Sequence, residues 1–310
     1  MTMVSQPPIG SVAESTALDF SPRHIRFAGH VWQHWPVLLL ATMLSLLYLP
    51  VLLGLIRQWS TDANYSHGFF VPLLTGYLIW RKRRDLAVAP VHPSPAGTVC
   101  VLLSVGLLFL GTLGAELFLQ RISLWLMIVG LLLYFLGWPK LRLMLFPIAF
   151  LLFMIPLPAI IYNEIVFPLQ LLTSRFATSC LQVANIVPVT REGNLLVLPN
   201  STLEVAEACS GIRSLISLLA FALGYSYLVE PSLLIRGAVA LATIPVAMLS
   251  NAARLIITAL LVYYVNPRAA EGMAHSTSSY ILVTIAAILI LMVHAALVWM
   301  RRNLRPGTAS

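Results

Sequence analysis

The sequence is poor in charged residues. Asp, Glu, Lys and Arg make up 10% of its 310 residues, whereas 59% are hydrophobic. Because a soluble globular domain needs more charge on its surface, this composition excludes that class of protein. Apolar runs long enough to cross the hydrocarbon of a bilayer recur along most of the chain. We therefore expect an all-α polytopic membrane protein.

Cysteine and the common catalytic motifs are scarce too. The three cysteines, Cys100, Cys180 and Cys209, are an odd number at scattered spacing, which gives neither a disulfide framework nor a zinc pattern. The sequence contains no HExxH or GxSxG pattern and no pair of carboxylates suited to acid–base chemistry. We therefore expect neither a metal nor a cofactor.

The apolar runs predict about eight transmembrane helices in a single domain, residues 34–302. A disordered cytosolic tail, residues 1–33, precedes this domain in the prediction, and a short cytosolic tail, residues 303–310, follows it. The predicted spans are residues 35–56, 66–80, 97–115, 122–138, 143–161, 210–229, 237–263 and 277–300.

The basic residues predict the orientation of these spans. The net charge is +8, but Lys and Arg cluster at the ends of the spans, so a nucleic-acid partner is not expected. The clusters RKRRD (81–85), KLR (140–142) and RRNLR (301–305) fall on one side of the membrane under this count. Because positive charge collects on the cytosolic side, both termini are predicted to be cytoplasmic.

Residues 164–189 are the least certain part of this count, because they form a further apolar segment. A central Arg175 would cost about 2.5–3.5 kcal/mol in hydrocarbon, so we expect an amphipathic helix on the outer surface instead of a ninth span. Residues 190–207 contain two short strand-like runs around the turn signal Pro-Asn-Ser. They predict a small β-hairpin on the outer face that leads to Cys209.

The stretch VAEACSGIRSL, residues 205–215, places several polar side chains at the start of an apolar run. Glu207, Cys209, Ser210 and Arg213 lie within seven residues of one another. A helix N-terminus and a nearby cation both lower the pKa of a thiol, and Arg213 is one helical turn beyond Cys209. Cys209 is thus a candidate nucleophile, and the alternative is a small buried apolar side chain.

Two further polar patches are predicted at the same outer level. Arg254 lies about 26 Å of helical rise beyond Gly237, near the outer boundary, and Asn251 shares its helix face. His275 lies in the outer loop at the entry to the last span. The alternatives are an arginine that snorkels to the headgroups and a solvated loop histidine.

A fourth polar patch, NYSHGFF (64–70), precedes the second span on the outer side. It contains Tyr65 and His67. His67 is an alternative to His275 as the base, or it binds substrate or lines the site. A cysteine, a histidine and an arginine together suit acyl transfer. The histidine takes the thiol proton, and the guanidinium donates hydrogen bonds to the oxyanion.

These motifs resemble those of the exosortases, especially the exosortase A type. The resemblance is carried by YSHGFFVPLLTGYLIWRKRR, REGNLLVLPNSTLEVAEACSGIRSL, NAARLIITALLVYY and HSTSSYILV, and it covers most of residues 36–300. It implies a bacterial membrane cysteine peptidase and transpeptidase with Cys209, Arg254 and His275 as its catalytic residues and Arg213 in support.

The resemblance also implies substrates that carry a C-terminal PEP-CTERM signal: a Pro-Glu-Pro motif, a transmembrane helix and a basic tail. Cleavage is then expected at the outer face of the inner membrane, and a surface glycan or lipid is the expected acceptor. Arg213 or Arg191 is hypothesised to meet the glutamate of the signal.

Two alternative functions remain open from the sequence. A transporter or flippase of a polysaccharide or lipid export pathway would use Arg213 and Arg254 to bind an anionic headgroup and would not need Cys209. A plain intramembrane protease would pass the same thioacyl group to water. The sequence specifies neither the acceptor nor the oligomeric state, and it does not choose between Arg213 and Arg254 for the oxyanion.

Overall fold

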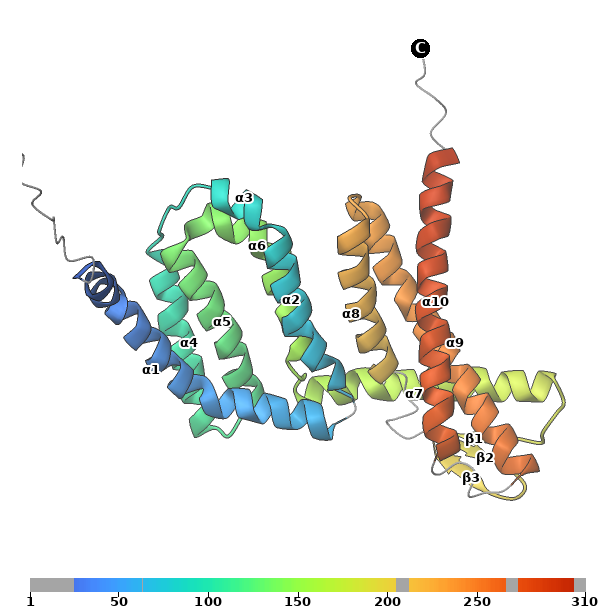
Figure 1. Cartoon of the computed structure of the whole chain (residues 1–310). Helices are drawn as coiled ribbons and strands as arrows, with labels where there is room; N and C mark the ends of the chain where they lie inside the picture. Colours follow the sequence, from blue (N-terminus) through green and yellow to red (C-terminus); the bar gives the residue numbers. More distant parts are fainter. Residues whose placement is uncertain (1–24, 63, 205–211, 266–272, 304–310) are drawn as a thin grey trace, which may run out of the picture. The chain divides into compact units, whose positions relative to one another are not determined.

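The structure is a computed structural model, and it describes residues 25–62, 64–204, 212–265 and 273–303 (Figure 1). The chain forms two compact units, Met1–Pro50 and Val51–Ser310. Helix α1, Ile25–Thr61, runs through the boundary between them and begins inside the predicted tail of residues 1–33. Every later element belongs to the second unit.

The first part of the second unit consists of helices. After α1 come the 3₁₀ turn η1 (Ser66–Phe69) and the helices α2 (Phe70–Arg81), α3 (Arg83–Val88), α4 (Ala96–Leu113), α5 (Leu117–Phe135) and α6 (Gly137–Phe150), followed by the 3₁₀ turn η2 (Leu151–Met154). Helices α4 and α5 form a closely packed antiparallel pair, and α2 packs against α6 (Figure 1).

The fold class predicted from composition is confirmed, but the number of long spans differs from eight. Six helices among the described residues are long and apolar enough to cross a membrane. The predicted span 66–80 corresponds to α2, whose 12 residues rise only about 18 Å. The predicted span 210–229 corresponds to α8 (Ile212–Val229), of which Ser214–Val229 forms a shorter apolar stretch.

The boundary between α5 and α6 differs from the prediction, which placed a basic loop at residues 140–142. These residues lie inside α6, because the chain turns earlier, at Gly137. Gly137 has a φ of 79°, and a Cβ there would overlap the carbonyl of His92. A glycine can adopt this left-handed conformation at little cost, so one residue is enough to separate the two helices.

Residues 164–189 form most of helix α7, Ala159–Val183, which is not among the six candidate spans of the described residues. Its buried residues recur every three to four positions, which places them on one face: Tyr162, Val166, Gln170, Thr173, Ser174, Ala177, Thr178 and Leu181. Arg175 is exposed, on the other side of the helix. The helix therefore has one buried face, and its exposed side also carries apolar residues such as Ile160 and Phe167. An amphipathic helix on the outer surface stays a prediction.

A three-stranded antiparallel sheet follows α7, where a two-stranded hairpin was predicted. Its strands, in the order β1-β2-β3, are β1 (Thr190–Glu192), β2 (Leu195–Val197) and β3 (Thr202–Glu204). The additional strand, β1, has the sequence Thr-Arg-Glu and so lacks the apolar residues by which a strand is recognised. Gly193, with a φ of 62°, lies in the turn between β1 and β2.

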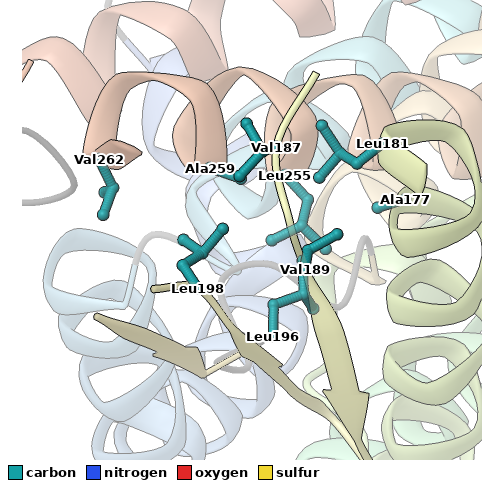
Figure 2. Packing of buried hydrophobic residues seen from close by; sticks show 9 residues of the cluster. All are labelled: Ala177, Leu181, Val187, Val189, Leu196, Leu198, Leu255, Ala259 and Val262. Atoms are coloured by element: carbon teal, nitrogen blue, oxygen red, sulfur yellow. The ribbon is translucent and has the colours of Figure 1, made fainter. Parts of the chain in front are cut away.

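The sheet packs against α7 and against α9, Leu233–Tyr264 (Figure 2). Leu196 of β2 is a fully buried member of this hydrophobic cluster. Asn200, in the turn after β2, donates from its side-chain Nδ2 to the carbonyl of Val262 at 3.2 Å. Polar and apolar contacts together therefore fix the sheet beside the C-terminal end of α9.

Helices α8, α9 and α10 (Met273–Asn303) pack side by side (Figure 1). Small side chains lie in the cluster between them, including the fully buried Ala222, Ala247 and Ala286. Small residues let membrane helices approach closely. This packing connects α8, which follows Cys209, with α9, which contains Arg254, and α10, which contains His275.

Candidate functional site

The predicted nucleophile lies in the segment between β3 and α8. Glu207, Cys209 and Ser210 fall outside the described residues, so the structure gives them no geometry. The elements on both sides of this segment are described. The sheet packs on α7, and α8 also packs on α7, where Ile216 contacts the buried pair Tyr162 and Val166. The sheet before the predicted nucleophile and α8 after it thus both pack on α7.

Arg254 lies buried in α9, with 7% of its surface exposed. Its guanidinium Nη2 donates to Asn251 Oδ1 at 2.6 Å, one helical turn earlier. Asn251 Nδ2 in turn donates to Thr173 Oγ1 on α7 at 3.5 Å. Because burying a cation is costly unless hydrogen bonds satisfy it, this chain of contacts fixes the position of the guanidinium.

For Arg213 and His275, the structure describes the backbone alone. Arg213 is in the first turn of α8, and His275 is in the first turn of α10. Both therefore lie at the beginning of a helix. The prediction that His275 lies in the loop before the last span is wrong, because α10 begins earlier, at Met273. The structure does not extend to their side chains, so their distances from Arg254 remain a prediction.

His67 lies in η1 and is held from both sides. Its ring Nε2 is 3.1 Å from the carbonyl oxygen of Phe153 in η2, and its Nδ1 is 3.3 Å from Ser217 Oγ on α8. A carbonyl oxygen can only accept a hydrogen bond, so Nε2 carries a proton and donates. In the neutral ring Nδ1 then accepts from the Ser217 hydroxyl.

Burial lowers the pKa of His67 below its ordinary value of 6.5, although a backbone hydrogen bond to Phe153 opposes the shift. His67 is therefore neutral at pH 7. A neutral ring with both nitrogens engaged joins η1 to η2 and α8. This arrangement suits a positioning residue better than a base whose nitrogen must face a thiol.

The turn around His67 is packed tightly. Tyr65 is buried, and its carbonyl accepts from the Gly68 N–H at 2.8 Å. A Cβ at Gly68 would lie 2.4 Å from Nε1 of Trp59, so another residue would displace the indole. Trp59 itself donates from Nε1 to the carbonyl of Met154 at 3.0 Å. The motif NYSHGFF thus forms a rigid turn against α1 and η2.

An apolar cavity of about 330 Å³ adjoins His67, between α2 and α8. Phe70 and Phe221, which are 72% and 41% exposed, line it. The remaining lining residues are His67, Val71, Leu74, Phe150, Ser217 and Ala220. The cavity offers an apolar surface with one imidazole and one hydroxyl at its edge.

The structure groups the described site residues into separate polar clusters. Asn251 and Arg254 lie together with Thr173 between α7 and α9, and His67 lies with Ser217 between η1 and α8. Arg191 is in β1, where its Nη1 donates to the carbonyl of Gly193 at 2.8 Å.

Sequence reasoning missed two residues of these clusters, Thr173 and Ser217. Ser217 is one turn after Arg213 on α8, so the periodicity of the helix could have indicated it. Thr173 lies on the polar stripe of α7, but nothing in the sequence connects that stripe with Asn251, 78 positions later.

In the part of the chain that the structure describes, six long apolar helices, further short ones and a small sheet define a multi-pass helical membrane protein. Residues 59–304 match the family model described as transmembrane exosortase (Exosortase_EpsH). Because this match covers most of the chain, the protein belongs to the transmembrane exosortase family. No curated protein and no solved structure matches it.

Proposed function

We propose that this exosortase is a membrane cysteine transpeptidase that cleaves the C-terminal PEP-CTERM signal of exported proteins. Cys209 forms the thioacyl intermediate, His275 acts as the base and Arg254 stabilises the oxyanion. The enzyme lies in the bacterial inner membrane with both termini cytoplasmic and its site on the periplasmic side. A surface glycan or lipid is the acceptor.

The observation that carries this proposal is the buried Arg254 within the region that matches the family. A guanidinium inside a membrane helix is costly and marks a function by default. The side chain of Asn251, which Thr173 contacts, holds this guanidinium in place. A donor fixed before the reaction stabilises developing negative charge without reorganisation, which is what an oxyanion requires.

The proposed reaction has two acyl-transfer steps. His275 takes the proton of the Cys209 thiol, and the thiolate attacks the carbonyl carbon of the scissile peptide. The tetrahedral oxyanion accepts hydrogen bonds from Arg254, the C–N bond breaks, and His275 returns the proton to the leaving amine. His275 then takes a proton from the acceptor, which attacks the thioester carbonyl. The C–S bond breaks, and the Cys209 thiolate takes this proton from His275 to leave as a thiol.

The remaining predicted site residues have supporting roles in this proposal. His67 and Tyr65 organise the turn beside α8, and Ser210 and Glu207 flank the nucleophile. Arg213 or Arg191 pairs with the glutamate of the signal. The apolar cavity beside His67 is assigned to the substrate, because a substrate helix in the membrane needs an apolar surface to pack on.

Mass spectrometry of the C-terminus of a PEP-CTERM substrate tests the proposal. In cells with the wild-type enzyme we expect a shortened C-terminus, with or without an attached acceptor. Cys209→Ala and Cys209→Ser should leave the substrate at full length, because an alanine has no nucleophile and a serine needs a stronger base. The free cysteine Cys180 offers a matched control, since Cys180→Ala should process normally.

Processing that survives Cys209→Ala, with a correctly inserted enzyme, would exclude the thioacyl route. Export that needs Arg254 but not Cys209 would instead favour the transporter alternative. Arg254→Lys should lose most activity, because an ammonium group cannot reproduce the planar geometry of the guanidinium donors.

A further inference from the structure

A second cavity, of about 600 Å³, lies where the α2–α3 junction meets the end of α8 and the beginning of α9. It is separate from the clusters of His67 and Arg254 and has no part in the proposed reaction. Its lining residues are Leu78, Arg81, Lys82, Asp85, Tyr227, Leu228, Val229, Glu230, Pro231 and Arg236. Three cations therefore face it, together with two carboxylates.

The three cations are held by backbone carbonyls. Arg81 Nη1 donates to Leu228 O at 2.9 Å, and Lys82 Nζ donates to Leu143 O at 2.7 Å. Arg236 Nε donates to the backbone oxygen of Glu230 at 2.5 Å. Because a carbonyl oxygen is uncharged, these hydrogen bonds do not neutralise the positive charge of the three groups.

The carboxylates do not neutralise these cations. The Glu230 side chain accepts from Arg301 Nη1 at 2.7 Å and from the Ser232 N–H at 2.9 Å. Among the described residues, no carboxylate lies within ion-pair distance of the three cations, and this includes Asp85. The cavity is therefore positively charged.

The aromatic ring of Tyr227 holds two of the cations, Lys82 and Arg236, in place. The ring of Tyr227 stacks on Phe146 at 3.8 Å between centroids, which fixes its plane. Arg236 lies 4.6 Å and Lys82 lies 5.4 Å from the centre of the same ring. Cation–π contacts at these distances hold the charges in position before a ligand arrives.

The edge of the cavity is apolar. Val229 lines it and is 52% exposed, and Leu233 and Leu234 begin α9 with 77% and 86% of their surfaces exposed. In a membrane protein such side chains face acyl chains. A charged cavity beside an acyl-facing surface matches a ligand with an anionic head and apolar tails.

We propose that this cavity binds a phosphate-bearing anion, the headgroup of an anionic phospholipid. Arg and Lys are the side chains that recognise phosphate, and basic pockets between membrane helices bind lipid headgroups. The cluster RKRR, of which two members line the cavity, is predicted on the cytoplasmic side, so the lipid belongs to the inner leaflet. Its binding would join α2 to α8 and α9.

Native mass spectrometry of the full-length protein in detergent tests this site. Phosphatidylglycerol is titrated against phosphatidylcholine with the same acyl chains. The double variant Lys82→Gln/Arg236→Gln should bind phosphatidylglycerol about thirtyfold more weakly, at roughly fivefold per cation. The matched control Arg84→Gln/Arg302→Gln removes equal charge from exposed side chains outside the cavity and should bind like the wild type.

Two more variants separate binding from folding. The charge-retaining variant Lys82→Arg/Arg236→Lys should keep most of the affinity. Arg81→Gln, which changes an exposed side chain, should weaken binding about fivefold even if the double variant does not fold.

Three outcomes would overturn the proposal. Equal losses in the double variant and its matched control would show diffuse surface charge, and equal binding of phosphatidylcholine would show that no anion is recognised. A third arm uses inorganic phosphate: displacement of phosphatidylglycerol by millimolar phosphate would assign the cavity to a soluble anion and exclude the lipid.

Discussion

At the scale of single residues, the described part of the site is organised by how polar groups are buried. Arg254 is embedded in a membrane helix, and the amide of Asn251 orients it through one hydrogen bond of 2.6 Å. His67 is oriented by a carbonyl on one side and a hydroxyl on the other. Each group is thus held before any substrate binds, as electrostatic catalysis requires.

Gly68 offers a test of the rigid turn around His67. Gly68→Ala should lower the stability of the protein by about 1–3 kcal/mol, because its Cβ would press into the Trp59 indole at 2.4 Å. It should also reduce processing, since the displaced turn carries His67. Thermal unfolding in detergent and substrate processing measure the two effects.

Gly76→Ala is the matched control, because a Cβ there meets nothing within 4 Å. It should leave stability unchanged or raise it slightly, since alanine favours a helix over glycine. Equal effects of the two substitutions would show that the contact with Trp59 is not responsible.

At the scale of elements, α7 supports the described elements on both sides of the proposed nucleophile, Cys209. The sheet, α8 and the buried polar pair of α9 all pack on it. A second junction connects α8, α9 and α10. Glu230, between α8 and α9, contacts Arg301 of α10 directly and lies 3.7 Å from Nε2 of His294, also in α10. Tyr225 OH lies 3.1 Å from the other ring nitrogen of His294.

Glu230 makes this junction sensitive to acid. The Ser232 N–H and then the Arg301 guanidinium hold the pKa of Glu230 below its ordinary value of 4.5, although burial opposes this shift. A carboxyl with a lowered pKa stabilises the folded state above its unfolded pKa and loses that contribution as the pH falls. The Tm of the wild type should therefore fall below about pH 4.5.

Glu230→Gln should lower the Tm at neutral pH and remove this part of its pH dependence. Glu164→Gln changes an exposed carboxyl on α7 and serves as the control. Differential scanning fluorimetry from pH 3 to pH 8 compares the three proteins, at about half-unit steps. An unchanged acid slope in Glu230→Gln would show that other groups produce it.

At the scale of the whole molecule, periodicity and composition predict the helical membrane class and a helix over most of residues 164–189. They do not predict the turn at Gly137 between α5 and α6 or the strand β1, because a single left-handed glycine and a three-residue polar strand carry little pattern. They find Asn251 and Arg254 through their intramembrane polarity. They miss Thr173, because its contact with Asn251 depends on tertiary packing.

Orientation is also a property of the whole molecule. Both termini are predicted to be cytoplasmic, because the basic clusters of residues 81–85 and 301–305 then face the cytosol. Reporter domains fused to either end should show cytoplasmic activity, and a reporter inserted after Gly193 should show periplasmic activity. A periplasmic C-terminus would reverse the side of the proposed site.

Cys209 as the covalent nucleophile is the central claim, and the mass of the enzyme during turnover tests it most directly. The protein is mixed with a PEP-CTERM substrate, quenched in acid and digested. The account predicts an acyl adduct on the peptide that contains Cys209, released by hydroxylamine and absent from Cys209→Ala. Processing of the substrate with no adduct on Cys209, or with the adduct on Cys180, would contradict it.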